Sequence, residues 1–507
     1  MHEDIVDENN ILQRASYWRE KPIACILKLD NMYGKEKGRL LYKCIPYNKH
    51  LPVFLVPYEE KKKFSKKRVH KYVLIKYKHW NDKHPIGILT QTFGNIDNLS
   101  CLYDYLLFAL DIHTSNQRFT KQFVIMYKQY TKQQHITTMK DKYKLEDRLS
   151  YSIITIDGET TQDFDDAIGY VKKGDVEILS IYISNPVLWM DHFDLWNEYG
   201  DRTSSIYLPD RVVNMLPNMM GTKVASLVEG EQSVAFVMDI YIRGSSIECI
   251  TYKNVIISVD HNYRYEEDKL LNNGIYKSIV GLLTSINKSV ENSYKCIEVL
   301  MIYFNSTIGE ELSRYNRGIY RYCTIKEIND KKVPEDLQNY MSWQDTRSDY
   351  SLYDPNLSHM ILGVTYYTQM SSPIRRVVDI INMIEIQIIN GMCVLTEHTI
   401  EYKKEWLTRL ELINKNHRSI RALESETKLL NYYMSTSNVE EEVHEVYVVL
   451  QIDEYKYKLY VPKLKATGIL KVIETIPLYT KIYCKLCLIQ DDINIVQKIR
   501  FIKVSST

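Results

Sequence analysis

Short runs in which apolar and polar residues alternate lie toward both ends of the chain, a pattern typical of half-buried strands. Such runs fall at residues 22–29, 51–56, 72–77, 446–452, 455–461 and 482–488. Short strands separated by turns at this spacing are typical of small β-barrels. We therefore predict two barrels at the N-terminal end, over residues 1–68 and 69–145, and a third barrel over 437–507.

Between these ends, strand patterns mix with long helical patterns, which predicts one large mixed domain over residues 146–436. The clearest helical pattern begins at Ser372 and Pro373 and ends at Gly391, because these residues suit a helix cap, a first helical position and a helix exit. A second long helix is predicted over roughly 401–433. The predicted fold class is a multidomain α+β chain, in which a core of mixed sheet and long helices is flanked by barrels.

A cluster of carboxylates follows an apolar run near the start of the mixed domain. Its acidic residues, with no basic residue among them, are Asp157, Glu159, Asp163, Asp165 and Asp166. Carboxylates this close together repel one another, and a multivalent cation removes that repulsion. A calcium EF-hand is excluded because Ile168 stands where that loop needs glycine. A helix cap or solvated turn remains one interpretation, but the spacing Asp-x5-Asp-x-Asp-Asp favours a site for a hard divalent metal.

Two adjacent arginines, Arg375 and Arg376, fall in the first turn of the helix predicted from Ser372. Cations are unfavourable at a helix N-terminus unless an anion is bound at the same place. Asp379 lies within reach of both arginines on the predicted helix. We expect Asp379 to pair with Arg376 and to leave Arg375 for an anion.

The composition limits the classes of partner. The 507 residues carry a net charge of +1, so only local patches could attract nucleic acid. The most basic stretch, Lys61–Lys71, is either a phosphate-binding patch or a solvated loop. No apolar stretch is long enough to span a bilayer, and no secretory signal is recognised. With nine cysteines, an odd number, these features predict a cytoplasmic protein in a reducing compartment, with no membrane partner.

The acidic cluster and the segment Ser371–Asp379 together resemble the catalytic RNB domain of the ribonuclease II/ribonuclease R superfamily. Other matching segments follow in the order of the family, at 205–210, 215–217, 226–236, 297–305, 320–321 and 363–368. Residues 71–94 resemble the second cold-shock barrel of the exosome-type branch, without the N-terminal endonuclease domain that this branch often carries. The resemblance implies two cold-shock OB-fold barrels, an RNB domain and an S1-type OB-fold barrel over the ranges given above.

The resemblance implies a processive 3′→5′ exoribonuclease that hydrolyses single-stranded RNA to 5′-nucleoside monophosphates with two metal ions. The implied cofactor is Mg²⁺ or Mn²⁺. By position in the motif, Asp157, Asp163, Asp165 and Asp166 match the catalytic, metal-binding aspartates. Arg375 matches the catalytic arginine that stabilises charge on the scissile phosphate.

RNA-binding roles are implied for five further residues. Tyr207 and Tyr265 match tyrosines near the 3′-terminal nucleotides, Glu298 matches the acid at the ribose hydroxyls, and Glu424 a glutamate near the cleavage site. Arg376 is expected to belong to the same RNA-binding set. The motif gives no position for the aromatic residue that closes the stack against Tyr265.

The chain departs from the family pattern at several places outside the metal-binding aspartates. The departures are Tyr182–Asn185, Cys323, Gln369 and Met383–Ile384, where the family has histidine-containing motifs. A catalytically impaired RNB-like scaffold that holds RNA is therefore an alternative, and a metal-dependent phosphodiesterase acting on DNA or small nucleotides is a third hypothesis. The retained aspartates favour the enzyme. The expected partners are single-stranded RNA and an RNA-decay complex, and the chain is expected to be monomeric.

Overall fold

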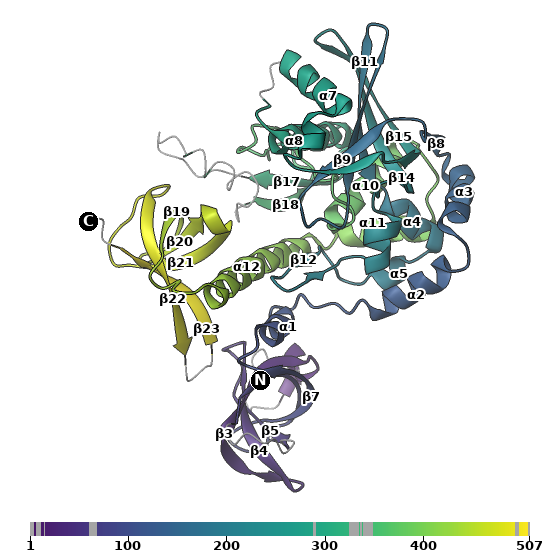
Figure 1. Cartoon of the computed structure of the whole chain (residues 1–507). Helices are drawn as coiled ribbons and strands as arrows, with labels where there is room; N and C mark the ends of the chain where they lie inside the picture. The colour runs from purple at the N-terminus through teal and green to yellow at the C-terminus, as the bar shows by residue number, and fades with distance from the viewer. Residues whose placement is uncertain are drawn as a thin grey trace.

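The structure is a computed structural model, and it describes residues 5–6, 12–14, 16–59, 68–286, 290–323, 334, 337, 348–491 and 496–504. Within these residues, a large domain of mixed sheet and helices is accompanied by two closed barrels (Figure 1). Both barrels lie close to the long helix α12 (Leu410–Ser435), which leaves the large domain and leads into the C-terminal barrel. The predicted fold class, an α+β core flanked by barrels, is confirmed.

The N-terminal barrel consists of β3 (Ile23–Glu36), β4 (Arg39–Pro46), β5 (Phe54–Tyr58), β6 (Lys71–His79) and β7 (Ile86–Asn95). The prediction of two barrels over 1–68 and 69–145 is wrong, because strands from both ranges close this one barrel in the order β3-β4-β5-β7-β6. The strands β3 to β5 alone would leave unpaired sheet edges. These edges are paired because β6 pairs with β3 and β7 pairs with β5. Most of the predicted basic segment, residues 61–67, lies outside the described residues.

Helices occupy the rest of the range that was predicted to be a second barrel. They are α1 (Leu99–Ala109), α2 (Gln117–Tyr127) and α3 (Lys132–Tyr143). The Asn98 side chain caps α1, and Thr131 and Gln134 form a reciprocal capping box at the start of α3. These helices connect the barrel to the core of the large domain.

The large domain is built on a seven-stranded sheet in the order β16-β9-β10-β11-β14-β15-β8. Its strands are β8 (Glu146–Asp147), β9 (Ile153–Asp157), β10 (Asp166–Lys173), β11 (Val176–Ser184), β14 (Gln232–Arg243), β15 (Ser246–Ser258) and β16 (His261–Arg264). The strands from β9 to β15 pair antiparallel along this order, whereas β16 runs parallel to β9. Apolar side chains of the sheet and of the helices beside it form one large core, in which Trp189 is fully buried.

The remaining helices of the large domain are α4 (Pro186–Phe193), α5 (Trp196–Tyr199), α6 (Asp268–Leu271), α7 (Gly274–Ser285), α8 (Ser293–Ser313), α10 (Val377–Ile389), α11 (Glu397–Leu407) and α12. Short strand pairs join β12 (Ile206–Tyr207) to β13 (Val212–Val213), β17 (Ile319–Cys323) to β18 (Ser348–Leu352), and β1 (Ile5–Val6) to β2 (Leu12–Arg14). The single helix predicted over 401–433 is therefore two helices, α11 and α12, which meet at residues 408–409.

The segment that carries the two adjacent arginines differs from its prediction. The helix begins only at Val377, so Arg375 and Arg376 precede the first turn instead of lying in it. Arg376 is extended, with φ −139° and ψ 129°, and forms a β-bridge with Ser204. The carbonyl oxygen of Arg375 accepts a 2.9 Å hydrogen bond from the Ser205 N–H. Pairing with this neighbouring segment therefore takes the place of the first helical turn.

The C-terminal barrel contains β19 (Val443–Asp453), β20 (Lys456–Val461), β21 (Ala466–Lys471), β22 (Lys481–Asp491) and β23 (Val496–Lys503). Its strands close in the order β19-β20-β21-β23-β22. Across the described parts of the whole chain, no helix has both the length and the apolar character needed to cross a bilayer.

Candidate active site

The aspartates of the acidic cluster line one cavity of about 1260 Å³, which we call the aspartate cavity. Strand β9 ends at Asp157 and the neighbouring strand β10 begins at Asp166, while Asp163 and Asp165 lie on the connection between them. The chain reverses between two paired strands, so residues at both ends of this connection come together. The same cavity is lined by Tyr207, Tyr265, Arg375 and Arg376.

Asp165 joins the acidic loop to the arginine segment. Its side chain is almost fully buried, and its Oδ1 accepts a 3.0 Å hydrogen bond from the Ile374 N–H. Its Oδ2 lies 3.2 Å from Nε of Arg375, an ion pair without the alignment of a hydrogen bond. Ser184 Oγ lies 3.5 Å from Oδ1. Both carboxylate oxygens of Asp165 therefore have protein partners.

The cavity carries more negative charge than its surroundings neutralise. Burial, together with repulsion from Asp166, raises the pKa of Asp157 to about 8. Burial also raises the pKa of Asp165 to about 7 and that of Asp166 to about 6, although Arg375 opposes both shifts. The pKa of Asp163 is raised for the same reason. Oδ2 of Asp157 is buried and accepts no hydrogen bond from the described residues. Such a cluster favours the binding of a cation.

The cluster is not a preformed metal cage. Among the described residues, no three histidine, cysteine, aspartate or glutamate side chains already stand in an arrangement that could hold an ion. Asp165 is occupied by Ile374 and Arg375. Rotation of carboxylates in the cavity is therefore needed before several of them can contact one ion.

The two arginines differ in their partners. Arg376 donates two hydrogen bonds to Asp379, at 2.8 and 2.7 Å, which confirms the predicted pair. Arg375 donates from Nη2 to Ser372 Oγ at 3.0 Å, and 43% of its side chain remains exposed. Arg375 can therefore reach an anion in the cavity while it contacts Asp165.

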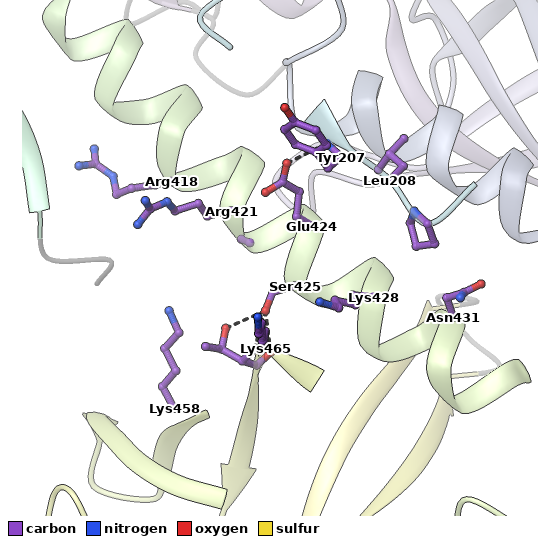
Figure 2. A pocket seen from close by; sticks show the side chains of 13 residues that line it. Tyr207, Leu208, Arg418, Arg421, Glu424, Ser425, Lys428, Asn431, Lys458 and Lys465 are labelled. Atoms are coloured by element: carbon purple, nitrogen blue, oxygen red, sulfur yellow. Dashed lines mark hydrogen bonds between the residues drawn. The ribbon is translucent and has the colours of Figure 1, made fainter. Parts of the chain in front are cut away.

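Tyr207 and Glu424, which are 217 residues apart, lie in direct contact. The Tyr207 N–H donates a 2.8 Å hydrogen bond to Oε1 of Glu424 (Figure 2). Burial raises the pKa of Glu424 to about 7, although this hydrogen bond opposes the shift. Tyr207 as a whole residue is 42% exposed, and it lines the cavity. The structure thus brings two predicted RNA-binding residues together at one edge of the site.

Tyr265 has an aromatic partner that sequence analysis missed. Its ring stacks on Tyr294 with centroids 3.9 Å apart and planes inclined by 13°. The Tyr265 N–H donates a 3.1 Å hydrogen bond to the Asp157 carbonyl oxygen, which fixes it beside the aspartates. Tyr294 lies one helical turn before Ile297, which lines the cavity. This helical spacing could have indicated Tyr294 as the aromatic partner of Tyr265. At 3.9 Å the rings leave no space for a base between them.

Glu298 is not among the residues that line the aspartate cavity. It lies on α8, where its carboxylate accepts a 3.2 Å hydrogen bond from Lys295. On the same helix, Asn305 does line the cavity, and its amide donates a 3.1 Å hydrogen bond to Ser371 Oγ. Asn305 thereby holds the start of the arginine segment, a role that the sequence did not indicate.

Two departures from the family pattern are neutral residues with hydrogen-bond partners. Asn185 is fully buried, caps α4, and donates a 3.0 Å hydrogen bond to Asn254 Oδ1. Gln369 accepts a 2.5 Å hydrogen bond from the Tyr350 hydroxyl. At these two positions the substituted side chains are satisfied parts of the core.

Two family models match the chain: "RNB domain" over residues 145–300, and "Dis3-like cold-shock domain 2" over residues 41–111. The second match begins in β4 and covers the rest of the N-terminal barrel. A ribonuclease R from Mycoplasmopsis pulmonis is 32% identical over 167 residues, which are 32% of this chain and 22% of that protein. The match thus spans less than a quarter of the length of this curated relative.

Solved structures share the fold over most of the chain. Mycoplasma genitalium RNase R in complex with ribose-methylated single-stranded RNA aligns with a TM-score of 0.69 and 15% identity, over 95% of this chain and 90% of that one. Yeast Ssd1, described as a pseudonuclease, aligns with a TM-score of 0.56 and 14% identity, over 94% and 67%. At such identities the likeness shows the fold and not the activity.

Proposed function

We infer that this chain, a member of the ribonuclease II/ribonuclease R superfamily of RNB-domain proteins, is a processive 3′→5′ exoribonuclease. In this proposal it hydrolyses single-stranded RNA and releases 5′-nucleoside monophosphates. One observation carries the proposal: the aspartate cavity gathers four carboxylates and the partly exposed guanidinium of Arg375.

The residues present fit a divalent cation. They offer hard oxygen donors, their pKa values are raised by burial, and one buried oxygen of Asp157 lacks a partner in the described structure. Asp157, Asp163 and Asp166 would hold the ion, and Asp165 would complete the set while it orients Arg375. Magnesium or manganese, as one ion or two, would supply positive charge beside the scissile phosphate.

The protein's own side chains would bind and position the RNA. Arg375 presents N–H groups to the phosphate oxygens, and its 3.2 Å contact with Asp165 sets the position of the guanidinium. Tyr207 and Tyr265 present ring faces on which terminal bases can stack. Glu424 fixes the Tyr207 backbone, because it accepts the Tyr207 N–H.

We extend the proposal to the cellular compartment of the protein. Among the described residues the cysteines form no disulfide bond, which suits a reducing cytoplasm. A monomeric state and membership of an RNA-decay complex stay predictions.

The deciding experiment incubates 5′-labelled single-stranded RNA with the protein in magnesium, and in parallel with chelator. We expect a ladder of shortened products that ends in a small 5′ fragment, and no shortening after chelation. RNA binding without shortening in magnesium would favour the scaffold alternative. Equal degradation of single-stranded DNA of the same sequence would favour a general phosphodiesterase.

A further inference from the structure

A buried arginine, Arg202, lies shortly before β12 and has no counter-ion among the described residues. It is 7% exposed, and its Nη2 donates a 2.6 Å hydrogen bond to the Ser115 carbonyl oxygen. Its Nε and Nη1 are buried and donate to no group in the described part of the chain. The neighbouring carboxylate, Asp201, is 65% exposed and pairs with Arg409 at 2.7 Å instead. A full positive charge thus lies in the interior with one neutral hydrogen-bond partner.

Arg148 shows what a buried arginine ordinarily requires. It is 3% exposed and donates hydrogen bonds of 2.8 and 2.5 Å to the two carboxylate oxygens of Asp239. Asp239 outweighs burial and raises the pKa of Arg148, whereas burial lowers the pKa of Arg202. The rings of Phe119 and Tyr199, with centroids 5.3 and 5.9 Å from Cζ of Arg202, offset only part of this cost. Because a buried charge without a partner destabilises the fold, Arg202 favours the binding of an anion.

Arg202 lines a cavity of about 20 Å³ at which three parts of the chain meet, and we call it the junction cavity. The connection after α1 contributes Thr114, the segment before β12 contributes Arg202 and Ser204, and α12 contributes Asn416. A side chain placed at Gly200 would meet Cγ2 of Thr114 at 3.4 Å and Nη1 of Arg202 at 3.8 Å. Nη1 of Arg202 therefore lies beside the wall that Thr114 forms.

The size and polarity of the junction cavity restrict its ligand. A cavity needs about 10–15 Å³ to hold one water molecule, so this one accepts a particle of that size and excludes phosphate, sulfate and nucleotides. Thr114, Thr203 and Ser204 bring hydroxyl groups that can donate hydrogen bonds. Oδ1 of Asn416 is buried and accepts no hydrogen bond from the described residues, and a half-turn of this amide presents its N–H₂ group instead. Donors around an uncompensated guanidinium favour a small anion over a neutral water.

We propose that the junction cavity binds a monatomic anion of the chloride class, with Arg202 as its principal ligand. The inference does not depend on the proposed function. The residues that follow Arg202 hold the arginine segment: the Thr203 carbonyl oxygen accepts a 2.9 Å hydrogen bond from the Val377 N–H, and the Ser205 N–H donates one of 2.9 Å to the Arg375 carbonyl oxygen. A bound anion thus fixes the start of the segment that positions Arg375.

The test is thermal unfolding of the full chain in sodium chloride and in sodium gluconate at equal ionic strength. We expect the midpoint of the parent to be higher in chloride by about 2 °C or more, and the difference to level off as chloride is raised, because the site fills. R202M keeps the length of the side chain without its charge and should lose the difference. R118Q is the matched control, since Arg118 is 80% exposed on the neighbouring helix α2, pairs with Glu198 and lies outside the cavity. R118Q should keep the difference.

Equal midpoints of the parent in the two salts would overturn the proposal, as would a chloride effect that R202M shares. Crystals of the parent grown in bromide keep the question open to measurement if R202M does not fold. We expect an anomalous scattering peak within hydrogen-bond distance of Nε or Nη1 of Arg202. A peak there without anomalous signal would identify a buried water and reject the anion, and a bromide peak without a chloride effect in solution would mean an adventitious ion only. No RNA enters these measurements, so their outcome is separate from that of the proposed function.

Discussion

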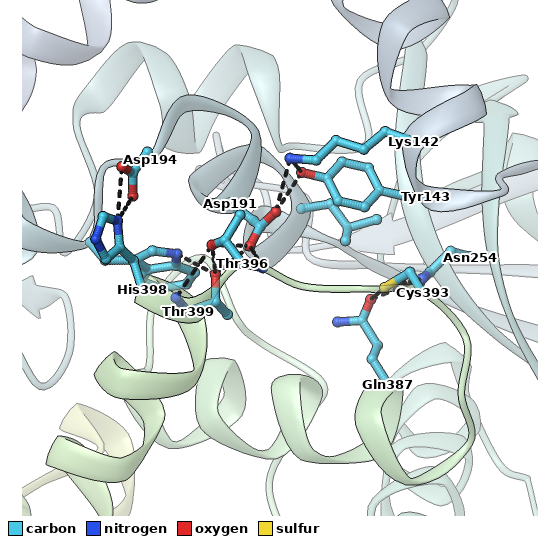
Figure 3. A network of polar contacts seen from close by, with 12 residues as sticks. Lys142, Tyr143, Asp191, Asp194, Asn254, Gln387, Cys393, Thr396, His398 and Thr399 are labelled. Carbon is cyan, nitrogen blue, oxygen red and sulfur yellow. Dashed lines mark hydrogen bonds and ion pairs between the residues drawn. The ribbon is translucent and has the colours of Figure 1, made fainter.

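Two acidic sites in the large domain, the aspartate cavity and the surroundings of Asp191, have opposite environments. Asp191, on α4, is buried and accepts hydrogen bonds from the Tyr143 hydroxyl at 2.7 Å, from Lys142 at 3.1 Å, and from the Thr396 N–H and hydroxyl at 2.8 and 2.7 Å (Figure 3). The Thr399 hydroxyl donates to it as well. Burial alone would raise the pKa of Asp191, but these hydrogen bonds outweigh burial and leave the pKa below its usual value.

Among the described residues, the aspartate cavity supplies such partners to Asp165 but not to both oxygens of Asp157. Asp157 has a buried oxygen without a partner among the described residues, and its pKa is raised to about 8. A buried carboxylate that is fully hydrogen-bonded joins elements of the fold, as Asp191 joins α3, α4 and α11. A cluster whose repulsion is left uncompensated weakens the fold and is suited to a ligand of opposite charge. The comparison separates a carboxylate that joins elements of the fold from a cluster that we propose to bind a cation, without reference to any relative.

The largest effect is expected for Asp157→Asn. This change removes a carboxylate that we propose to bind the metal, and it should lower turnover of RNA by about a thousandfold or more, since metal-site stabilisation is worth several kcal/mol. The free energy of unfolding in chelator should stay level or rise, because repulsion from Asp166 is relieved. Single-turnover cleavage of 5′-labelled RNA and urea unfolding measure the two quantities. Turnover equal to that of the parent would contradict the assignment of this carboxylate.

Arg375→Ala should lower turnover by about a hundredfold, the scale for loss of one transition-state donor. The matched change is Lys142→Ala, which removes the cation beside Asp191 and should leave the rate per folded molecule near that of the parent. Arg375→Lys should recover only part of the loss, because an ammonium lacks the planar fork of guanidinium. Equal rate losses for Arg375→Ala and Lys142→Ala would remove the distinction between the two sites.

Asp191→Asn should lower the free energy of unfolding by about 2–3 kcal/mol, because the new amide N–H₂ group faces donors that need an acceptor. Urea unfolding in chelator measures this loss, with Asp157→Asn as the control. Cleavage per folded molecule should remain near the parent value. A loss below about 0.5 kcal/mol, the range of ordinary surface substitutions, would show that the Asp191 network contributes little to the fold.

Sequence patterns predict the aspartate cluster better than the network around Asp191, because the members of the cluster lie close together in the sequence. Asp157 and Asp166 are separated by one short connection between paired strands, and the pair of Arg376 with Asp379 spans three residues. Asp191, in contrast, takes partners about 50 and 200 residues away, and no spacing in the chain links them. The stack of Tyr294 on Tyr265 depends in the same way on where a helix packs.

The same dependence on contacts between distant residues explains where the predicted fold was wrong. Alternation locates strands, but it does not say which distant strand closes a barrel, so the pairing of β3 with β6 was missed. Local preference favoured a helix from Pro373, whereas the β-bridge between Ser204 and Arg376 delays its start to Val377. Tertiary pairing overrides local preference at both places.

The smallest effect concerns the pH dependence of stability next to Asp191. His192 lies 3.2 Å from His135, between Nε2 and Nδ1, and also faces Lys142 and Asp191. Burial, with His135 and Lys142, lowers the pKa of His192 from 6.5 to about 4. Between these two pH values the unfolded chain binds a proton that the folded protein excludes, so stability falls as the pH falls from 6.5 to 4 and the loss stops below 4.

His192→Gln should remove this contribution, which is on the order of 1–3 kcal/mol between pH 7 and pH 4. The measurement is urea unfolding of parent and variant at several pH values, and the difference between the two curves isolates the histidine. His398 is the control, because its exposed ring pairs with Asp194 at 2.8 Å and its pKa is raised. His398→Gln should therefore change stability in the opposite direction, with a contribution that is present below pH 6.5 and lost as the pH rises. Parallel curves for parent and His192→Gln would mean that this histidine is hydrated in the folded protein, and that the surroundings of Asp191 are less dry than its hydrogen bonds imply.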